Sequence, residues 1–294
     1  MSRLSATPLL IGTFLLRLNG GAGNVVLGLF LAQLAIHAGR SITSIQVGLL
    51  AVAFFTTELT LAPVMGALSD RWGRRNFLII GPFFGLLSVG LLLLTPVERP
   101  LSYLLCVQVL SGLASAILVP SSLSYLADFT SQNQALRVRI MSFYELATSG
   151  GIAVGVAVGG FIWDHLGRFA FALLAMSYLL VAACMILTPR VKQVIDHMPL
   201  SLMAARYWYI IRTPRLFIFI PAWICVSALV GIWFSSQVPF LLAMPSHDHH
   251  QHLLGSMHGP GGGSRISLIL GGFVLFFGLC LLSFQVTPRS RPAR

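Results

Sequence analysis

Long apolar stretches alternate with short polar segments along this chain. A helix needs about 20 apolar residues to cross the hydrocarbon core of a bilayer. Eight stretches meet this requirement, at residues 8–36, 44–68, 76–95, 101–127, 141–162, 169–188, 215–243 and 266–286. The pattern therefore predicts an all-α membrane protein built as a polytopic helical bundle.

Composition supports this prediction and excludes an ordinary soluble domain. Hydrophobic residues make up 56% of the chain and charged residues only 9%, whereas soluble domains have about 25% charged residues. The net charge is +11, but the basic residues occupy short loops between apolar stretches. We therefore expect a lipid bilayer as the partner and no nucleic acid. The four cysteines lie within apolar stretches, where we interpret them as small core residues, and no cofactor or metal is expected.

The loop between the second and third stretches reads GALSDRWGRR. Gly66 permits close approach of two helices, and Gly73 permits a tight turn. Arg71, Arg74 and Arg75 place three positive charges in one short loop, and such loops lie on the cytoplasmic side of membranes. This orientation puts both termini in the cytoplasm, together with most of the basic residues, and predicts a multi-pass protein of the cell membrane.

The same loop resembles the signature between helices 2 and 3 of the major facilitator superfamily. Every defining position of Gly-x-x-x-Asp-Arg-x-Gly-Arg-Arg is filled, by Gly66, Asp70, Arg71, Gly73, Arg74 and Arg75. The resemblance implies a secondary transporter of small solutes with a six-helix amino-terminal half. It also implies that Arg74 pairs with Asp128, and that Asp70 lies against the opposite half in the outward-open state.

The resemblance divides the chain into segments. Residues 1–188 form the amino-terminal half, and residues 189–214 an amphipathic basic linker at the cytoplasmic surface. From the resemblance we expect residues 215–286 to supply two helices of an incomplete second half, followed by a basic tail at residues 287–294. The His-rich loop at 245–265 lacks a cysteine partner and lies among glycines, so we interpret it as a solvated external loop rather than a metal site.

Polar side chains within the apolar stretches are candidates for a solute or proton pathway, because such groups must face protein or water. They are Arg17, Asn24, Glu58, Gln108, Ser115 and Glu145. Arg17 lies about 12 Å and Glu58 about 15 Å from the same membrane side. The depths allow an Arg17–Glu58 ion pair, and Glu58 as a proton carrier is the alternative. Glu145 can equally pair with Arg137 or Arg139, and the small polar positions of helices 1 and 4 can equally serve helix packing.

Glycines recur along the fifth stretch, at Gly151, Gly155, Gly159 and Gly160. Small residues four apart form a groove for another helix. The run also resembles the helix-5 pattern of the antiporter branch, although Val156 replaces its proline, so helix packing and an antiporter role both remain open.

Two functions are compatible with these features. The first is alternating-access transport of a small solute, driven by an ion gradient and possibly proton-coupled efflux, since no nucleotide-binding loop occurs. The second is a transport-incompetent fragment or one part of a split carrier, which inserts but needs a complementary carboxy-terminal half or a second copy. No catalytic constellation is present, so an enzyme is not expected.

Overall fold

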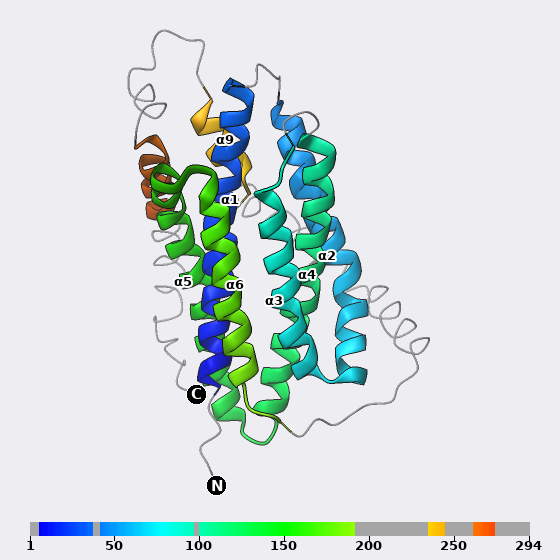
Figure 1. Cartoon of the computed structure of the whole chain (residues 1–294). Helices are drawn as coiled ribbons and strands as arrows, with labels where there is room; N and C mark the ends of the chain where they lie inside the picture. The colour runs from blue at the N-terminus through cyan, green and yellow to red at the C-terminus, as the bar shows by residue number, and fades with distance from the viewer. Residues whose placement is uncertain (1–5, 38–41, 97–99, 192–234, 245–260, 274–294) are drawn as a thin grey trace, which may run out of the picture.

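The computed structural model describes residues 6–37, 42–96, 100–191, 235–244 and 261–273 (Figure 1). These residues form helices and no strands. The elements are α1 (Thr7–His37), α2 (Ser44–Trp72), α3 (Arg74–Leu92), α4 (Pro100–Phe129), α5 (Gln134–Leu166), η1 (Gly167–Phe169), α6 (Ala170–Leu187) and α9 (Gln237–Ala243). Residues 262–273 are also helical. The prediction of an all-α helical bundle is confirmed.

The helices α1 to α6 correspond to the first six predicted stretches, and polar residues cap the start of two of them. The Thr43 hydroxyl accepts a hydrogen bond from the backbone N–H of Gln46, whose side chain caps Thr43 in return. The Asn133 side chain caps α5 by accepting from Leu136. Within the described residues, five segments are long and apolar enough to cross a membrane, and the last of them contains both α5 and α6.

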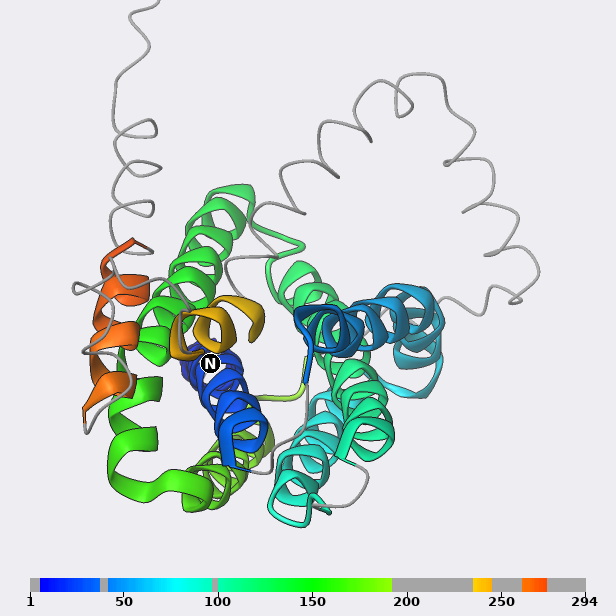
Figure 2. The same ribbon diagram turned by 90° about the horizontal axis from the view of Figure 1, so that it is seen from above.

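The six long helices pack as two groups of three (Figure 2). One group consists of α1, α5 and α6, and the other of α2, α3 and α4, with α3 packed against α6 between them. The sequence triplets α1–α3 and α4–α6 therefore contribute to both groups, which is the interleaving expected for repeated three-helix units. The outer faces of α3 and α6 expose apolar side chains, including Ile80, Phe83, Leu173 and Met176, as expected for lipid-facing helices.

The glycines of α5 allow its backbone to lie directly on α1. A Cβ added to Gly151 would lie 2.5 Å from the Phe14 carbonyl oxygen, and one on Gly155 would overlap the Leu18 carbonyl. Gly159 faces Ala22 in the same way. Gly160, in contrast, lies against Gly263 of the helix at 262–273. Three of the four predicted packing glycines thus face α1, and the fourth faces a later helix.

The later part of the chain differs from the prediction where it is described. Within the seventh stretch, Ser235 and Ser236 form a bend and a turn, after which α9 begins. The helix in the eighth stretch begins at residue 262 rather than 266, because the Asp164 side chain caps its first turn. The predicted loop 245–265 therefore extends too far. The remainder of that loop, nearly all of the 189–214 linker, the rest of both stretches and the 287–294 tail lie outside the described residues.

The bundle has two distinct ends. The arginine end carries the α2–α3 turn, with Asp70, Arg74 and Arg75, and the α4–α5 turn. The opposite end carries the α5–α6 turn and α9 (Figure 1).

Candidate functional site

The α2–α3 turn at the arginine end depends on a single glycine. Gly73 has φ 100°, a conformation that favours glycine, and its N–H donates to the Ser69 carbonyl at 3.0 Å. Because α3 begins at the next residue, Asp70 and Arg74 lie only one turn apart. The sequence alone indicated this turn.

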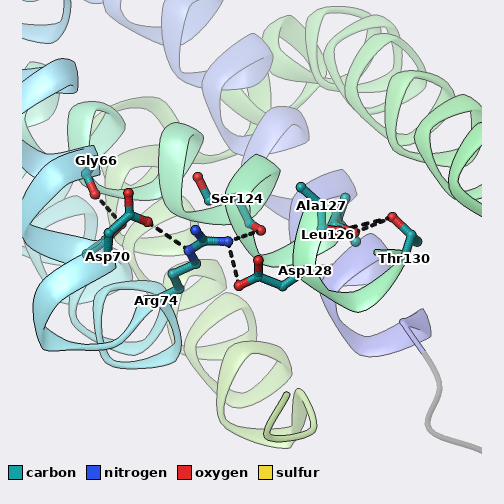
Figure 3. A network of polar contacts seen from close by, with 9 residues as sticks. Gly66, Asp70, Arg74, Ser124, Leu126, Ala127, Asp128 and Thr130 are labelled. Atoms are coloured by element: carbon teal, nitrogen blue, oxygen red, sulfur yellow. Dashed lines mark hydrogen bonds and ion pairs between the residues drawn. The ribbon is translucent and has the colours of Figure 1, made fainter. Parts of the chain in front are cut away.

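The Arg74 guanidinium lies between two carboxylates from different helices (Figure 3). Its Nε lies 2.8 Å from Asp70 Oδ1, and its Nη1 lies 2.5 Å from Asp128 Oδ2. The same Nη1 donates to the Ser124 carbonyl at 2.5 Å. Arg74 is 15% exposed, so these charge-assisted contacts are shielded from solvent screening. The structure brings together the three residues expected to form one cluster between α2, α3 and α4.

Arg75 has a role that the sequence did not reveal. Its Nε donates to the Thr188 carbonyl at 3.0 Å and its Nη2 to the Ile186 carbonyl at 2.7 Å. These carbonyls end α6, where unpaired C=O groups favour a cation. The Tyr125 hydroxyl donates to the next carbonyl, that of Pro189, at 2.6 Å. Arg75 thus ties the start of α3 to the end of α6, whereas Arg71 is exposed.

Glu58 lies at the middle of α2 and faces α4. The Ser115 hydroxyl donates to Glu58 Oε1 at 2.6 Å. Gly112, one turn before Ser115, permits this approach because a Cβ there would lie 2.5 Å from the Phe54 carbonyl oxygen. Among the described residues, no ion pair joins Glu58 to a cation.

The predicted ion pair between Arg17 and Glu58 is wrong for this structure. Among the described residues, no ion pair joins Arg17 on α1 to Glu58, and the Arg17 Nε is buried without a hydrogen-bond partner. The physical reason is that α1 packs on α5 and α6 while α2 packs on α4. Similar depth in the membrane therefore does not make the two side chains neighbours.

The remaining candidates are distributed along the bundle. Asn24 and Gln108 are half-buried on α1 and α4, and Glu145 is exposed on α5. Glu145 makes no ion pair with Arg137 or Arg139 in the described part of the chain. The Arg139 guanidinium lies over the Phe143 ring, 5.8 Å from its centroid.

Asp164 at the opposite end was not a sequence candidate, yet both of its carboxylate oxygens accept hydrogen bonds. Oδ1 accepts from the Gly263 N–H at 3.0 Å, and Oδ2 accepts from the Ser264 N–H at 2.6 Å. The Ser264 hydroxyl also donates to Oδ2 at 2.6 Å. Arg168, four residues after Asp164, donates to the Thr95 carbonyl at 2.9 Å and so ties η1 to the segment that follows α3.

Comparison with known proteins identifies the family. The sequence model of the Major Facilitator Superfamily matches residues 9–290, and the chain belongs to this superfamily of carriers. It is 29% identical over 144 residues to Multidrug resistance protein 1 of Bacillus subtilis (strain 168), across 49% of this chain and 36% of that protein. An uncharacterized MFS-type transporter of Methanocaldococcus jannaschii is 25% identical over 265 residues, across 83% of this chain and 67% of the relative.

A solved structure shares the fold. The crystal structure of D-xylose-proton symporter matches with a TM-score of 0.58 at 16% identity, across 95% of this chain and 69% of that one. The resemblance read from the α2–α3 loop is therefore confirmed at the level of family and fold. The chain spans only part of its relatives, since the matches cover 36% and 67% of the two proteins above.

Proposed function

We propose that this protein is a secondary transporter that exports a small lipophilic cation in exchange for protons by alternating access. Membership of the superfamily supports carrier activity. The name of the Bacillus subtilis relative, a multidrug resistance protein, supports drug-like solutes as the substrate class. The proton-symporter title of the structural neighbour supports proton coupling.

The observation that carries this proposal is the Glu58–Ser115 contact. A carboxylate at the middle of a membrane helix is costly unless it has a partner. Among the described residues, Glu58 has a neutral partner, the Ser115 hydroxyl, and no cation. Such a carboxylate is neutralised either by a proton or by a cationic solute. Competition between these two for one site is the simplest basis for exchange.

The location and domain organisation extend the proposal. The arginine loop favours a cytoplasmic position for the arginine end and for both termini in the cell membrane. Residues 1–188 would form the amino-terminal half, residues 189–214 the linker, and residues 215–286 helices of the second half. Arg74, between Asp70 and Asp128, would belong to the gate on the cytoplasmic side.

Transport by reconstituted protein tests the proposal. The full chain in liposomes should move a fluorescent lipophilic cation saturably when a pH gradient is imposed. Glu58→Gln should abolish the response to the gradient, because glutamine cannot exchange a proton, whereas Glu58→Asp should retain part of it. Thr60→Ala is the matched control, because the Thr60 hydroxyl donates only to carbonyls of α2 itself. Equal gradient-driven transport by the wild type and Glu58→Gln would overturn the assignment.

A further inference from the structure

One sequence pattern occurs at both ends of the bundle. Residues 66–77 and 160–171 both read Gly-x-x-x-Asp-x-x-Gly-Arg-x-x-Phe. Each copy leads from a long helix through a glycine of positive φ into the next helix, with φ 100° at Gly73 and 52° at Gly167. The α2–α3 and α5–α6 turns lie at opposite ends (Figure 1), as inverted repeats require. Asp70 and Asp164 are therefore equivalent acids on the two sides of the membrane.

The two acids bind different partners. Asp70 pairs with Arg74 of its own copy at 2.8 Å. Asp164 instead accepts three hydrogen bonds from Gly263 and Ser264, at 2.6–3.0 Å. These residues lie in the first turn of the helix at 262–273. An acidic side chain that binds the free N–H groups of a helix N-terminus stabilises the contact through both hydrogen bonds and the helix dipole.

The contact below Asp164 is close-packed. The Gly160 N–H donates to the Ser267 hydroxyl at 2.6 Å, and both residues are buried. A Cβ at Gly271 would lie 2.8 Å from the Ala157 Cβ. Nearby, Gly28 of α1 faces the start of α9, and the Gln237 side chain donates to the Ser44 carbonyl at 3.1 Å. The first six helices are thus joined to α9 and to the helix at 262–273 at the opposite end of the bundle.

We propose that Asp164 is a latch that holds this end of the carrier closed. Through its two carboxylate oxygens it fixes α5 to the helix at 262–273, so the halves separate at this end only after those hydrogen bonds break. The inference rests on the proposed alternating-access function. It adds that the repeated pattern supplies one acid to each gate, and that, among the described residues, Asp164 is the acid of the two that bonds to a later helix.

Cysteine labelling tests the latch directly. The reporter is Ala157→Cys in a background in which Cys106, Cys184, Cys225 and Cys280 are serine. Position 157 is half-buried beside Gly271, so a membrane-impermeant maleimide should label it faster when α5 separates from the helix at 262–273. Asp164→Asn should increase the labelling rate about 5- to 30-fold, because the amide NH2 group cannot accept the two hydrogen bonds that Ser264 donates to Oδ2. Asp70→Asn, the equivalent change at the other end, is the matched control and should not increase it.

Two outcomes would overturn the latch. One is a labelling rate for Asp164→Asn equal to that of the parent, and the other is an equal increase for Asp70→Asn. If Asp164→Asn fails to insert, Ser264→Ala provides the test, because it removes one of the three bonds and should raise labelling about 2- to 10-fold. An unchanged rate for Ser264→Ala would then contradict the latch. Labelling needs no solute, so its result is independent of the transport test on Glu58.

Discussion

The packing of α5 on α1 makes a prediction that two neighbouring glycines can test. In Gly151→Ala, the new Cβ would lie 2.5 Å from the Phe14 carbonyl oxygen and 2.9 Å from the Arg17 Cβ. Ordinary contact begins at 3.4 Å, so the two backbones must move apart by about 0.9 Å in a close-packed interface. In Gly150→Ala, the nearest atom is Phe14 Cε2 at 3.8 Å, so the methyl group fits without movement.

The two substitutions should therefore change stability in opposite directions. Overpacking costs about 1–3 kcal/mol, and the cost should be near the upper end because one of the opposing atoms belongs to the backbone. Replacing glycine by alanine within a helix stabilises the folded state by about 1 kcal/mol, because alanine has the higher helix propensity. The net loss for Gly151→Ala is thus about 2 kcal/mol, or an apparent Tm about 4–8 °C lower. Gly150→Ala gains only the helix propensity and should raise Tm by about 2–4 °C.

Thermal unfolding of the purified protein in detergent, followed by tryptophan fluorescence, measures both shifts under identical conditions. Both variants replace one glycine by alanine, at neighbouring positions, so they have the same composition. Effects on expression or on the unfolded chain should therefore nearly cancel when the two variants are compared. A Gly151→Ala protein that melts at or above the wild type would refute the packing of α5 on α1 described above.

Three further predictions concern the arginine end. Arg74→Ala and Asp128→Ala should each lower Tm, and their double-mutant cycle should show a coupling of about 0.5–3 kcal/mol; strict additivity would show that the ion pair contributes nothing. Arg75→Ala should lower the free energy of unfolding by about 1–3 kcal/mol, because two hydrogen bonds to α6 carbonyls are lost. Arg71 is exposed, so Arg71→Ala should change this free energy by no more than about 0.5 kcal/mol. Equal losses for the two variants would contradict the role of Arg75. A reporter fused after Arg99 should read external and one after Arg75 cytoplasmic, and the reverse pattern would invert the proposed orientation.

The sequence predicted the features that depend on local pattern. Spans of apolar residues located α1 to α6, and the spacing of Asp70, Gly73 and Arg74 located the turn because its contacts lie within one helical turn. The sequence left the glycines of α5 open between helix packing and an antiporter role, and the structure places Gly151, Gly155 and Gly159 against α1.

Contacts between distant segments could not be predicted in the same way. The Arg17–Glu58 pairing failed because it assumed that helices adjacent in sequence are adjacent in space, whereas α1 and α2 belong to different groups. The bonds of Arg75 to α6 span more than a hundred residues. Asp164 was missed although a signal existed, since the pattern around Asp70 recurs around it with the same spacing. A search for inverted repeats would have found it.

The central claim is that Glu58 exchanges a proton for the transported cation, and proton release on solute binding tests it most directly. Purified protein in weakly buffered detergent solution, with a pH indicator, should release protons when a lipophilic cation is added. Glu58→Gln should bind the cation without releasing protons, because its side chain has no proton to exchange. Equal proton release by the wild type and Glu58→Gln, or cation binding by the wild type without any release, would contradict the account.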